Sequence, residues 1–300
     1  MKNIKVLVTG ANGQVGFELV QRFKGNVDLL ALDRHSLDIS NAHEVDEVIT
    51  RFRPDVIVNA AAYTSVDNAE IEVEQAKKIN EDGPRYLAVA ATKVGAIVIH
   101  ISTDYVFSGE KLTSYIESDI AEPSGIYGKT KLAGEMEVAK FCHRHIILRT
   151  AWVFGKHGSN FVKTMLRLGM TKSEIGVVAD QFGAPTYAGD IADVIVHIAT
   201  MIIKKPNMEA WGTYHFCGYP YVSWFEFAKA IFEASNISDP TSEVPILNPI
   251  QTQDYPTRAK RPHNSRLDCL KIKRAFNVSP SAWQNALVDI NSYKVKNEIN

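Results

Sequence analysis

The amino-acid sequence predicts an α/β fold, a doubly wound, parallel, Rossmann-like sheet accompanied by a smaller α/β lobe. Three observations lead to this fold class. Short β-branched runs alternate with segments of helical periodicity through the first half of the chain. The first of these runs ends in a glycine-rich turn. The chain has 300 residues, 45% of them hydrophobic, and can therefore bury a substantial core.

The alternation starts at the N-terminus. Residues 4–8 form a short β-branched run, and the period becomes helical from Val15 onward. Strands joined by helices pair in parallel, so the remaining elements extend one sheet. They are a strand at 27–32, a helix at 42–52, a strand at 55–59, a long helix through about 69–93, a strand at 96–101, the helix that contains Tyr127 and a strand at 145–149.

The alternation loosens after Thr150, where Pro, Gly and aromatic residues become more frequent. We therefore predict a first domain over residues 1–150 and a smaller lobe formed mainly by residues 151–300. The chain is free to cross between these two units more than once. The expected helices after Thr150 lie near 160–169, 189–204, 223–235, 266–276 and 281–292, with short strands at 175–178 and 213–216.

Composition excludes several classes of protein. The 33 Lys and Arg residues balance 34 Asp and Glu residues, so no basic footprint of a nucleic-acid binder is present. The 3 cysteines are odd in number and far apart, which favours a reducing compartment and a cytoplasmic location. The N-terminal apolar run is too short for a signal peptide, and Asp193 and His197 interrupt the most apolar helical segment, so we expect no membrane span.

The glycine turn predicts a dinucleotide site. In "TGANGQVG", Gly10, Gly13 and Gly16 lie between the first strand and the first helix. Glycines there let the backbone approach a pyrophosphate, which the helix N-terminus attracts. Gln14 and Val15 complete the predicted contact, which makes the first domain a dinucleotide-binding domain. A glycine-rich connection without a ligand is the alternative.

Two further segments are expected beside the cofactor. Asp33 follows the second strand, where an acidic residue binds the adenosine ribose and favours NAD. Arg34 comes next and suits the 2′-phosphate of NADP, so the sequence leaves NADH and NADPH both open. Asp38 and Ile39 follow at the place where an adenine ring docks in such folds.

The third strand ends in "NAAAYT", residues 59–64. Ligands of open α/β sheets bind beyond the carboxyl ends of the strands, and small residues there let a ribose or nicotinamide approach the backbone. We therefore include Ala62, Tyr63 and Thr64 in the cofactor site. Tight packing of a helix against the strand end would also explain the alanines.

The strand at 96–101 ends in "STDYVFSG", which places Thr103 and Asp104 at the same edge. Tyr127 follows 24 residues after Thr103, and Lys131 comes 4 residues later, on the same face of a helix. A turn satisfied by its own side chains is the alternative for the strand end. Gly128 follows Tyr127, and we expect it to loosen the start of the helix.

Together, the glycine turn, "NAAA", the Thr at a strand end and Tyr-x-x-x-Lys resemble the extended short-chain dehydrogenase/reductase family. Within it, several longer motifs are similar to those of the dTDP-4-dehydrorhamnose reductases. They are "NAAAYTSVDNAE", "STDYVFSG", "YGKTKLAGE", "LRTAWVFG", "GSNFVKTMLRL", "DQFGAPT" and "RPHNSRL". These motifs extend from residue 10 to residue 267, so the resemblance covers nearly the whole chain.

The chemistry of a carbonyl reduction explains the three catalytic candidates. A carbonyl that accepts hydride needs an acid for its oxygen, and Tyr127 is the predicted acid. The charge of Lys131 stabilises the tyrosinate, because a cation within about 4–6 Å lowers the pKa of a phenol by on the order of 1–3 units. Thr103 is expected to hydrogen-bond the substrate oxygen. The resemblance also implies that Tyr127 and Lys131 contact the cofactor, with Lys131 on the nicotinamide ribose.

The resemblance implies a reductase that transfers hydride from NADPH or NADH to C4 of dTDP-4-dehydro-L-rhamnose and gives dTDP-L-rhamnose, for cell-surface polysaccharide biosynthesis. Thr103 and Asp104 would contact the sugar, and Trp152 would pack on it. In "YPTRAKRPHNSR", the basic residues Arg258, Lys260, Arg261 and Arg266 suit a diphosphate.

Two other functions stay open. One is a nucleotide-sugar epimerase or dehydratase of the same superfamily, although the dehydratases tend to carry Asp-Glu where this chain has Asp104-Tyr105. The other is a non-catalytic nucleotide-binding regulatory subunit. Some relatives form metal-bridged dimers, which leaves a homodimer open, but the sequence shows no convincing acidic ligand set, and we predict no metal.

Overall fold

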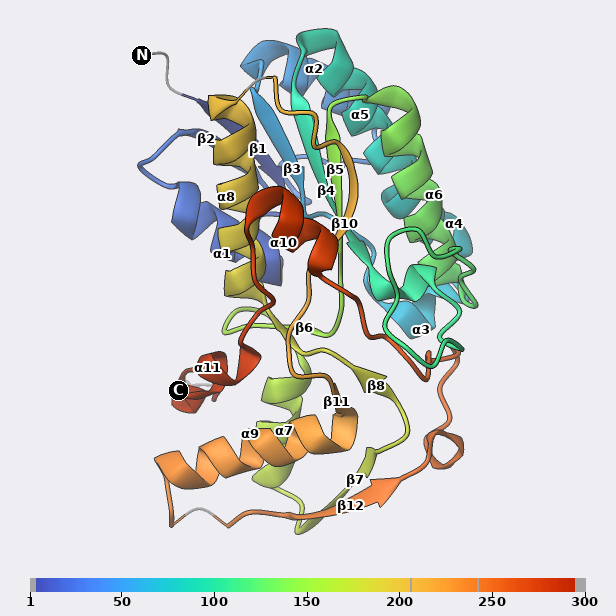
Figure 1. Cartoon of the computed structure of the whole chain (residues 1–300), viewed down its shortest axis with the longest axis vertical. Helices are drawn as coiled ribbons and strands as arrows, with labels where there is room; N and C mark the ends of the chain where they lie inside the picture. The colour runs from blue at the N-terminus through green and yellow to red at the C-terminus, as the bar shows by residue number, and fades with distance from the viewer. Residues whose placement is uncertain (1–3, 206, 242, 295–300) are drawn as a thin grey trace.

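The computed structural model describes residues 4–205, 207–241 and 243–294. Its centre is a six-stranded parallel sheet with the strand order β10-β5-β4-β3-β1-β2 (Figure 1), which confirms the predicted fold class. The strands are β1 (Lys5–Thr9), β2 (Asp28–Leu32), β3 (Val56–Asn59), β4 (Ile97–Thr103), β5 (His145–Thr150) and β10 (Gly212–His215).

Helices cover both faces of this sheet, because its central strands are apolar on both sides. Val6 and Val8 of β1 belong to a core shared with α1 and α8, whereas Leu7 between them belongs to a core shared with α2 and α5. Figure 1 shows these two helical layers on either side of the strands. The helices are α1 (Gln14–Phe23) and α8 (Ala188–Lys204) on one face, and α2 (Ala42–Phe52), α5 (Gly83–Val94) and α6 (Ile126–Phe141) on the other.

The order of the strands locates the expected ligand site. From β1 the chain passes to β2 on one side and then to β3 on the other side, so the direction of winding reverses next to β1. In open α/β sheets the ligand crevice lies at this reversal, beyond the carboxyl ends of the strands. The glycine turn follows β1 and therefore lies in the crevice.

The predicted long helix over 69–93 is wrong as a single helix. The short helix α3 (Val66–Ala69) ends where the segment starts, and the segment itself contains α4 (Val73–Lys77), a π-helical turn (Lys78–Asp82) and α5. Pro84 has no N–H to donate to the carbonyl of Asn80, so a regular α-helix is interrupted there. The wider π turn absorbs this defect, and π turns of this kind are frequent at functional sites.

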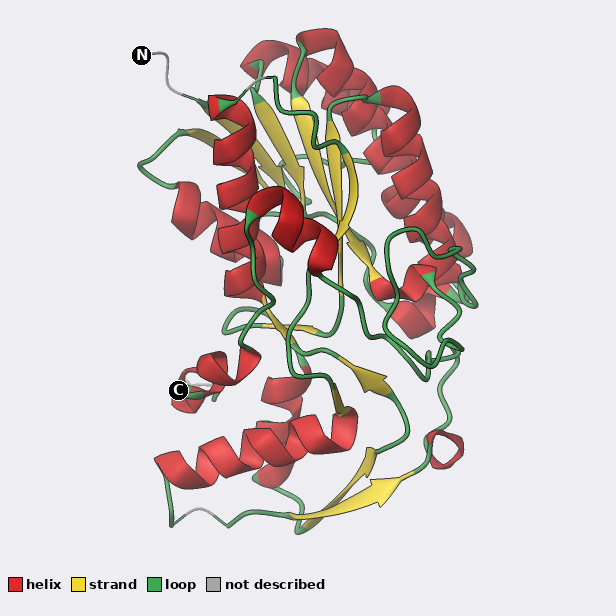
Figure 2. Ribbon diagram, viewed as in Figure 1, coloured by secondary structure: helices red, strands yellow, loops and turns green. Residues whose placement is uncertain are grey.

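A smaller lobe lies below the sheet in the view of Figure 2, and a separate core holds it together. Its parallel strand pair joins β7 to β12, a strand that contains Asn248-Pro249 and that the sequence analysis did not predict. The elements are α7 (Phe161–Gly169), β7 (Glu174–Val178), α9 (Trp224–Ser238), β12 (Ile246–Ile250), α11 (Trp283–Leu287) and the 3₁₀ turn Ile290–Tyr293.

The chain returns to the large sheet after Thr150. The strand expected at 213–216 is β10, and it pairs with β5 at the edge of the sheet. The helix expected at 189–204 is α8, which packs in the core next to α1. The helix expected at 266–276 is shorter, α10 (Leu270–Phe276). Within the described ranges, no helix is long and apolar enough to cross a membrane.

Candidate active site

The glycines of the turn leave backbone atoms uncovered by side chains at the start of α1. Gly10 has φ +69°, and a Cβ on it would lie 2.6 Å from the backbone nitrogen of Ala61. Gly13 caps α1 without a side-chain hydrogen bond, so the first N–H groups of the helix are left for another acceptor. Glycine at position 10 thus allows the tight approach to Ala61, and the free donors at the start of α1 fit a dinucleotide pyrophosphate.

Gly16 makes this turn possible, because a Cβ on it would lie 2.0 Å from the carbonyl oxygen of Gly10. We expect Gly16→Ala to displace the turn, cost about 1–3 kcal/mol of stability and weaken cofactor binding by more than about tenfold. Fluorescence titration of the reduced nicotinamide measures the binding. Gly176→Ala in β7 is the matched control, since its Cβ would meet Ile250 at 3.4 Å, an ordinary contact. Wild-type affinity in Gly16→Ala would contradict this account.

The side chains of Val15 and Gln14, also predicted in the cofactor site, point in different directions. The side chain of Val15 is buried in the core under the sheet, so its backbone faces the turn. The Gln14 amide oxygen accepts a hydrogen bond from Asn160 at 3.0 Å. Because Asn160 caps α7, Gln14 connects the turn to the smaller lobe.

Asp33 lies just after β2 and is held in place by four hydrogen bonds. One oxygen accepts from Asn12 at 2.7 Å, and the other accepts from the Ser36 hydroxyl at 2.8 Å and from the N–H groups of Ser36 and His35. The bonds from Ser36 and His35, led by that of the Ser36 hydroxyl, lower the pKa of Asp33. Arg34 is exposed beside it.

The remaining cofactor candidates lie along the same edge. Asp38 accepts from the Ser40 hydroxyl at 2.7 Å, and the Ile39 side chain is buried against Gly83 rather than directed at the surface. Asn80, in the π turn, pairs with both backbone groups of Tyr63, at 2.8 and 3.1 Å. It therefore fixes the Ala62–Thr64 segment beside α6.

Thr103, Asp104 and Tyr127 lie together at the carboxyl end of β4. The Thr103 hydroxyl donates to an Asp104 carboxylate oxygen at 2.9 Å, and it lies close enough to the Tyr127 phenol, in the first turn of α6, to influence the pKa of that phenol. Burial raises the pKa of the Tyr127 phenol, and the nearby Thr103 hydroxyl opposes that shift. Burial also raises the pKa of Asp104 to about 6. The site thus holds a protonated phenol beside a weakly acidic carboxyl group.

Lys131 lies one helical turn after Tyr127 and is 2% exposed. Its Nζ donates to the carbonyl oxygen of Ile101 at 2.7 Å and lies 3.4 Å from Nε2 of His100. Burial lowers the pKa of Lys131 to about 8, although Glu135 acts in the opposite direction. The charge on Lys131 can therefore change near neutral pH.

Tyr105 connects this group to the chain near residue 260. Its ring meets the Tyr127 ring edge-on at 5.5 Å, and its hydroxyl accepts from Arg261 at 3.2 Å. Arg261 is also paired with Asp67. The other three basic residues expected near a diphosphate do not reach this group. Lys260 pairs with Glu110, Arg266 binds Asn264 and the carbonyl of Leu112, and Arg258 is exposed.

Trp152 occupies a left-handed conformation with φ +46°, which is rare for a bulky residue. Its indole stacks on Trp224 of α9, with ring centroids 3.5 Å apart, and lies against Gly183, where a Cβ would be 2.3 Å from the ring. Strained backbone of this kind is concentrated at functional sites. The indole is thus held between the two units of the fold.

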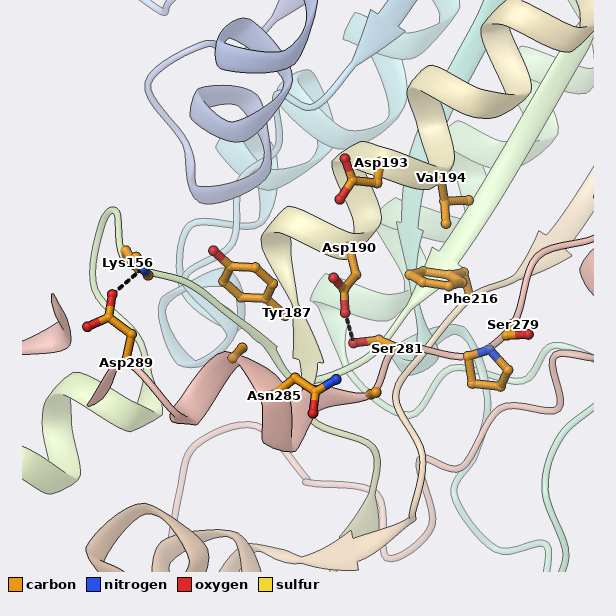
Figure 3. A pocket seen from close by; sticks show the side chains of 13 residues that line it. Lys156, Tyr187, Asp190, Asp193, Val194, Phe216, Ser279, Ser281, Asn285 and Asp289 are labelled. Atoms are coloured by element: carbon orange, nitrogen blue, oxygen red, sulfur yellow. Dashed lines mark hydrogen bonds and ion pairs between the residues drawn. The ribbon is translucent and has the colours of Figure 1, made fainter. Parts of the chain in front are cut away.

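A separate pocket of about 510 Å³ lies between the start of α8 and α11 (Figure 3). Its lining contains no residue predicted for the cofactor or the substrate. Its polar groups bind one another, since Lys156 pairs with Asp289 and Asp190 accepts from Ser281. Across the part of the chain that the structure describes, no cluster of three His, Cys, Asp or Glu side chains is arranged to hold a metal ion.

Sequence reasoning did not identify Asn80, His100 or Tyr105. Asn80 is recognisable only through the π turn, for which Pro84 is the one indication in the sequence. His100 lies two residues before the strand-end Ser102, on a strand whose apolar neighbours predict simple core packing. Tyr105 belongs to the quoted motif "STDYVFSG", so its position was a usable signal.

Comparison with known proteins covers almost the whole chain. A family model described as the RmlD substrate binding domain matches residues 4–294. The chain is also similar to a dTDP-4-dehydrorhamnose reductase of Aggregatibacter actinomycetemcomitans, with 50% identity over 96% of this chain and 99% of that protein.

Two solved structures agree with this similarity. A dTDP-4-dehydrorhamnose reductase from Clostridium acetobutylicum has a TM-score of 0.88 and 39% identity, over 96% of this chain and 98% of that chain. The enzyme of that name from Bacillus anthracis, solved in complex with NADP, has a TM-score of 0.85 and 40% identity, over 97% of this chain and 99% of that one.

Proposed function

This protein belongs to the dTDP-4-dehydrorhamnose reductase family, and from that membership we propose that it transfers hydride from NAD(P)H to C4 of dTDP-4-dehydro-L-rhamnose, giving dTDP-L-rhamnose. The membership confirms the resemblance to extended short-chain reductases that the motifs indicate. The structural observation that supports the activity most is the proximity of Thr103 to Tyr127 at the carboxyl edge of the sheet, with Lys131 one turn further along α6.

The acid in this reaction is Tyr127. When bound, the reduced nicotinamide supplies the hydride. As hydride adds to C4, the carbonyl oxygen gains negative charge, and the Tyr127 hydroxyl gives its proton to that oxygen to complete the alcohol. Because burial raises the pKa of Tyr127, the phenol holds its proton until the substrate oxygen becomes basic. Thr103 orients the reacting oxygen, and the Lys131 ammonium stabilises the tyrosinate that is left.

The cofactor-binding residues follow the edge of the sheet. Backbone groups of the glycine turn would hold the pyrophosphate, with Gly16 keeping α1 close. Lys131 would hold the nicotinamide ribose. The full proposed set is Gly10, Gly13, Gln14, Val15, Gly16, Asp33, Arg34, Asp38, Ile39, Ala62, Tyr63, Thr64, Tyr127 and Lys131.

The two cofactors differ at the adenosine ribose. The Asp33 carboxylate suits the free hydroxyls of NADH, whereas the exposed Arg34 suits the 2′-phosphate of NADPH. The Bacillus anthracis relative was solved with NADP. We propose that the protein accepts both cofactors, with Arg34 contributing to NADPH binding.

On the substrate side, Trp152 would pack against the sugar ring, and Asp104 would contact a neighbouring hydroxyl. The stacking of Trp152 on Trp224 supports this proposal, because it keeps the indole in one place as a flat apolar surface. Of the four basic residues expected near a diphosphate, Arg261 is favoured, since it reaches Tyr105 next to Tyr127.

A direct assay tests the proposed function against its two alternatives. Purified protein is mixed with dTDP-4-dehydro-L-rhamnose and either NADPH or NADH, and the absorbance of the reduced nicotinamide is followed together with the sugar products. We expect one reduced cofactor to be consumed for each sugar reduced. Sugar turnover at constant absorbance would indicate an epimerase or dehydratase, and cofactor binding without turnover would indicate a regulatory subunit.

Three wider features are also proposed. The enzyme would act in the cytoplasm, in line with its three buried free cysteines. It would work as a homodimer, which sedimentation of the purified protein tests. Residues 1–150, with the later returns of α8 and β10, would bind the cofactor, and most of 151–300 would bind the sugar nucleotide.

A further inference from the structure

A row of buried polar side chains crosses the sheet beneath the active site and ends at Lys131. Thr9 of β1 donates to Asn59 of β3 at 2.7 Å, and Asn59 meets Nδ1 of His100 on β4 at 3.0 Å. Nε2 of His100 then lies 3.4 Å from Nζ of Lys131 on α6. His100 is fully buried, and the reaction described above makes no use of it.

The partners of Asn59 determine which way its amide is turned. Its Oδ1 accepts from the Thr9 hydroxyl and, at 3.1 Å, from the backbone N–H of Ala61. A backbone N–H group can only donate, so the atom that faces it must be the amide oxygen. The Asn59 NH₂ group therefore donates to Nδ1 of His100, and Nδ1 carries no proton.

The protonation of His100 follows from this arrangement. Burial lowers its pKa well below the ordinary value, with the nearby charge of Lys131 as the second cause, so the imidazole is neutral. A neutral imidazole with an unprotonated Nδ1 carries its proton on Nε2. The Nε2–H group points at Lys131, whose neutral amine has a lone pair to accept it and whose ammonium has none.

We propose that His100 is a positioning residue that donates from Nε2–H to Lys131 and thereby favours the neutral amine over the ammonium. The Ile101 carbonyl, 2.7 Å from the same nitrogen, fixes the amine between two partners. This inference deepens the proposed function, on which its catalytic meaning rests.

The consequence for the reaction is a proton path. Each reduction takes one proton from Tyr127, and the tyrosinate must regain one. If the Lys131 ammonium supplies that proton, the tyrosine is restored and a neutral amine is left, which recovers its own proton from solvent. His100 stabilises the amine at this step, so it lowers the cost of releasing the proton.

The surrounding ionisable groups leave room for this effect. Glu135 on α6 favours the ammonium, but a bidentate pair with Arg149 of β5 neutralises it. Three other sets of ionisable groups lie near this region. His145 of β5 acts on His100, and Asp104 and Tyr105, which follow β4, act on Tyr127. Arg85 of α5 pairs with Glu137 on the outer part of α6.

The tautomer can be observed without any substrate. In protein labelled with ¹⁵N-histidine, the His100 signals are assigned as those missing from His100→Asn, or from His100→Gln if the first variant does not fold. We expect a neutral imidazole with the proton on Nε2 throughout the neutral pH range. A proton on Nδ1, or a charged imidazolium, would overturn the inference.

Two substitutions test the effect on Lys131. In His100→Asn the new Oδ1 still accepts from Asn59, but the shorter side chain places its NH₂ group short of the position from which Nε2 meets Lys131. In His100→Gln the side-chain carbonyl can accept from the ammonium. Since Lys131 is proposed to hold the cofactor as the ammonium, NADPH affinity should weaken as pH rises through about 8 in the wild type. We expect this midpoint to rise by about one pH unit in both variants, a roughly tenfold change in the ionisation constant.

His145→Asn is the matched control, because it removes another buried imidazole from the same face of the sheet, where His145 binds the Cys142 carbonyl. It should leave the midpoint unchanged. The alkaline limb of kcat/KM should move with the binding midpoint in the two His100 variants. If the His100 variants had a lower kcat but an unchanged midpoint of NADPH binding, His100 would have only a structural role and the proposal would be overturned. If the His100 tautomer and the binding midpoints were as expected but no sugar was reduced, the proposed function would be refuted instead.

Discussion

Replacing Tyr127 by Phe should lower kcat by on the order of 10²–10⁴-fold while leaving the affinity for the reduced cofactor close to that of the wild type. The substitution removes the hydroxyl that lies near Thr103 and that would protonate the substrate oxygen. The ring remains, so its edge-on contact with Tyr105 at 5.5 Å, which helps to place α6, is kept. Steady-state kinetics and fluorescence titration of the reduced nicotinamide measure the two quantities.

The control for this experiment is Tyr214→Phe in β10. It also removes a buried tyrosine hydroxyl, one that donates to the Ala210 carbonyl at 3.1 Å at the edge of the sheet. We expect it to lower the thermal midpoint and to leave kcat unchanged. If Tyr127→Phe turned over at the rate of the control, another group would have to be the acid, and Asp104, whose pKa burial raises to about 6, would be the next candidate.

The fold class could be predicted because it depends on local patterns. Apolar strands, intervening helices and the glycine turn are all visible over a few residues, and the six-stranded parallel sheet confirms them. Features that depend on distant contacts could not be predicted. β10 joins β5 across more than sixty residues of chain, and nothing in its sequence distinguishes that edge from the smaller lobe.

The same distinction applies to the site. Thr103, Tyr127 and Lys131 follow from motif and spacing, and their proposed roles remain predictions. The row from Asn59 to His100 and Lys131 depends on the register of β3 and β4, which joins residues 41 positions apart, and on the packing of α6, which joins residues 31 positions apart. Gly128 shows a further limit. We expected it to loosen the helix, but a Cβ there would lie 2.1 Å from the carbonyl oxygen of Tyr105, so it allows close packing of α6.

The other large effect should come from the buried ion pair that holds α6 against the sheet. Arg149 of β5 donates to Glu135 at 2.9 Å from Nε and at 2.6 Å from Nη2, and both side chains are less than 10% exposed. Glu135→Ala leaves the Arg149 charge buried without its partner. We expect a loss of about 3–5 kcal/mol in the free energy of unfolding, measured from the shift of the urea midpoint at constant slope.

The double variant Glu135→Met/Arg149→Met separates the cost of an unpaired charge from the value of the pair. Replacing both partners by apolar side chains of similar volume removes the buried charge altogether, so stability should return to within about 1–2 kcal/mol of the wild type. Activity should follow, because the first turns of the same helix carry Tyr127 and Lys131. A double variant as unstable as Glu135→Ala would show that specific hydrogen bonds, and not the compensation of charge, hold α6 in its catalytic position.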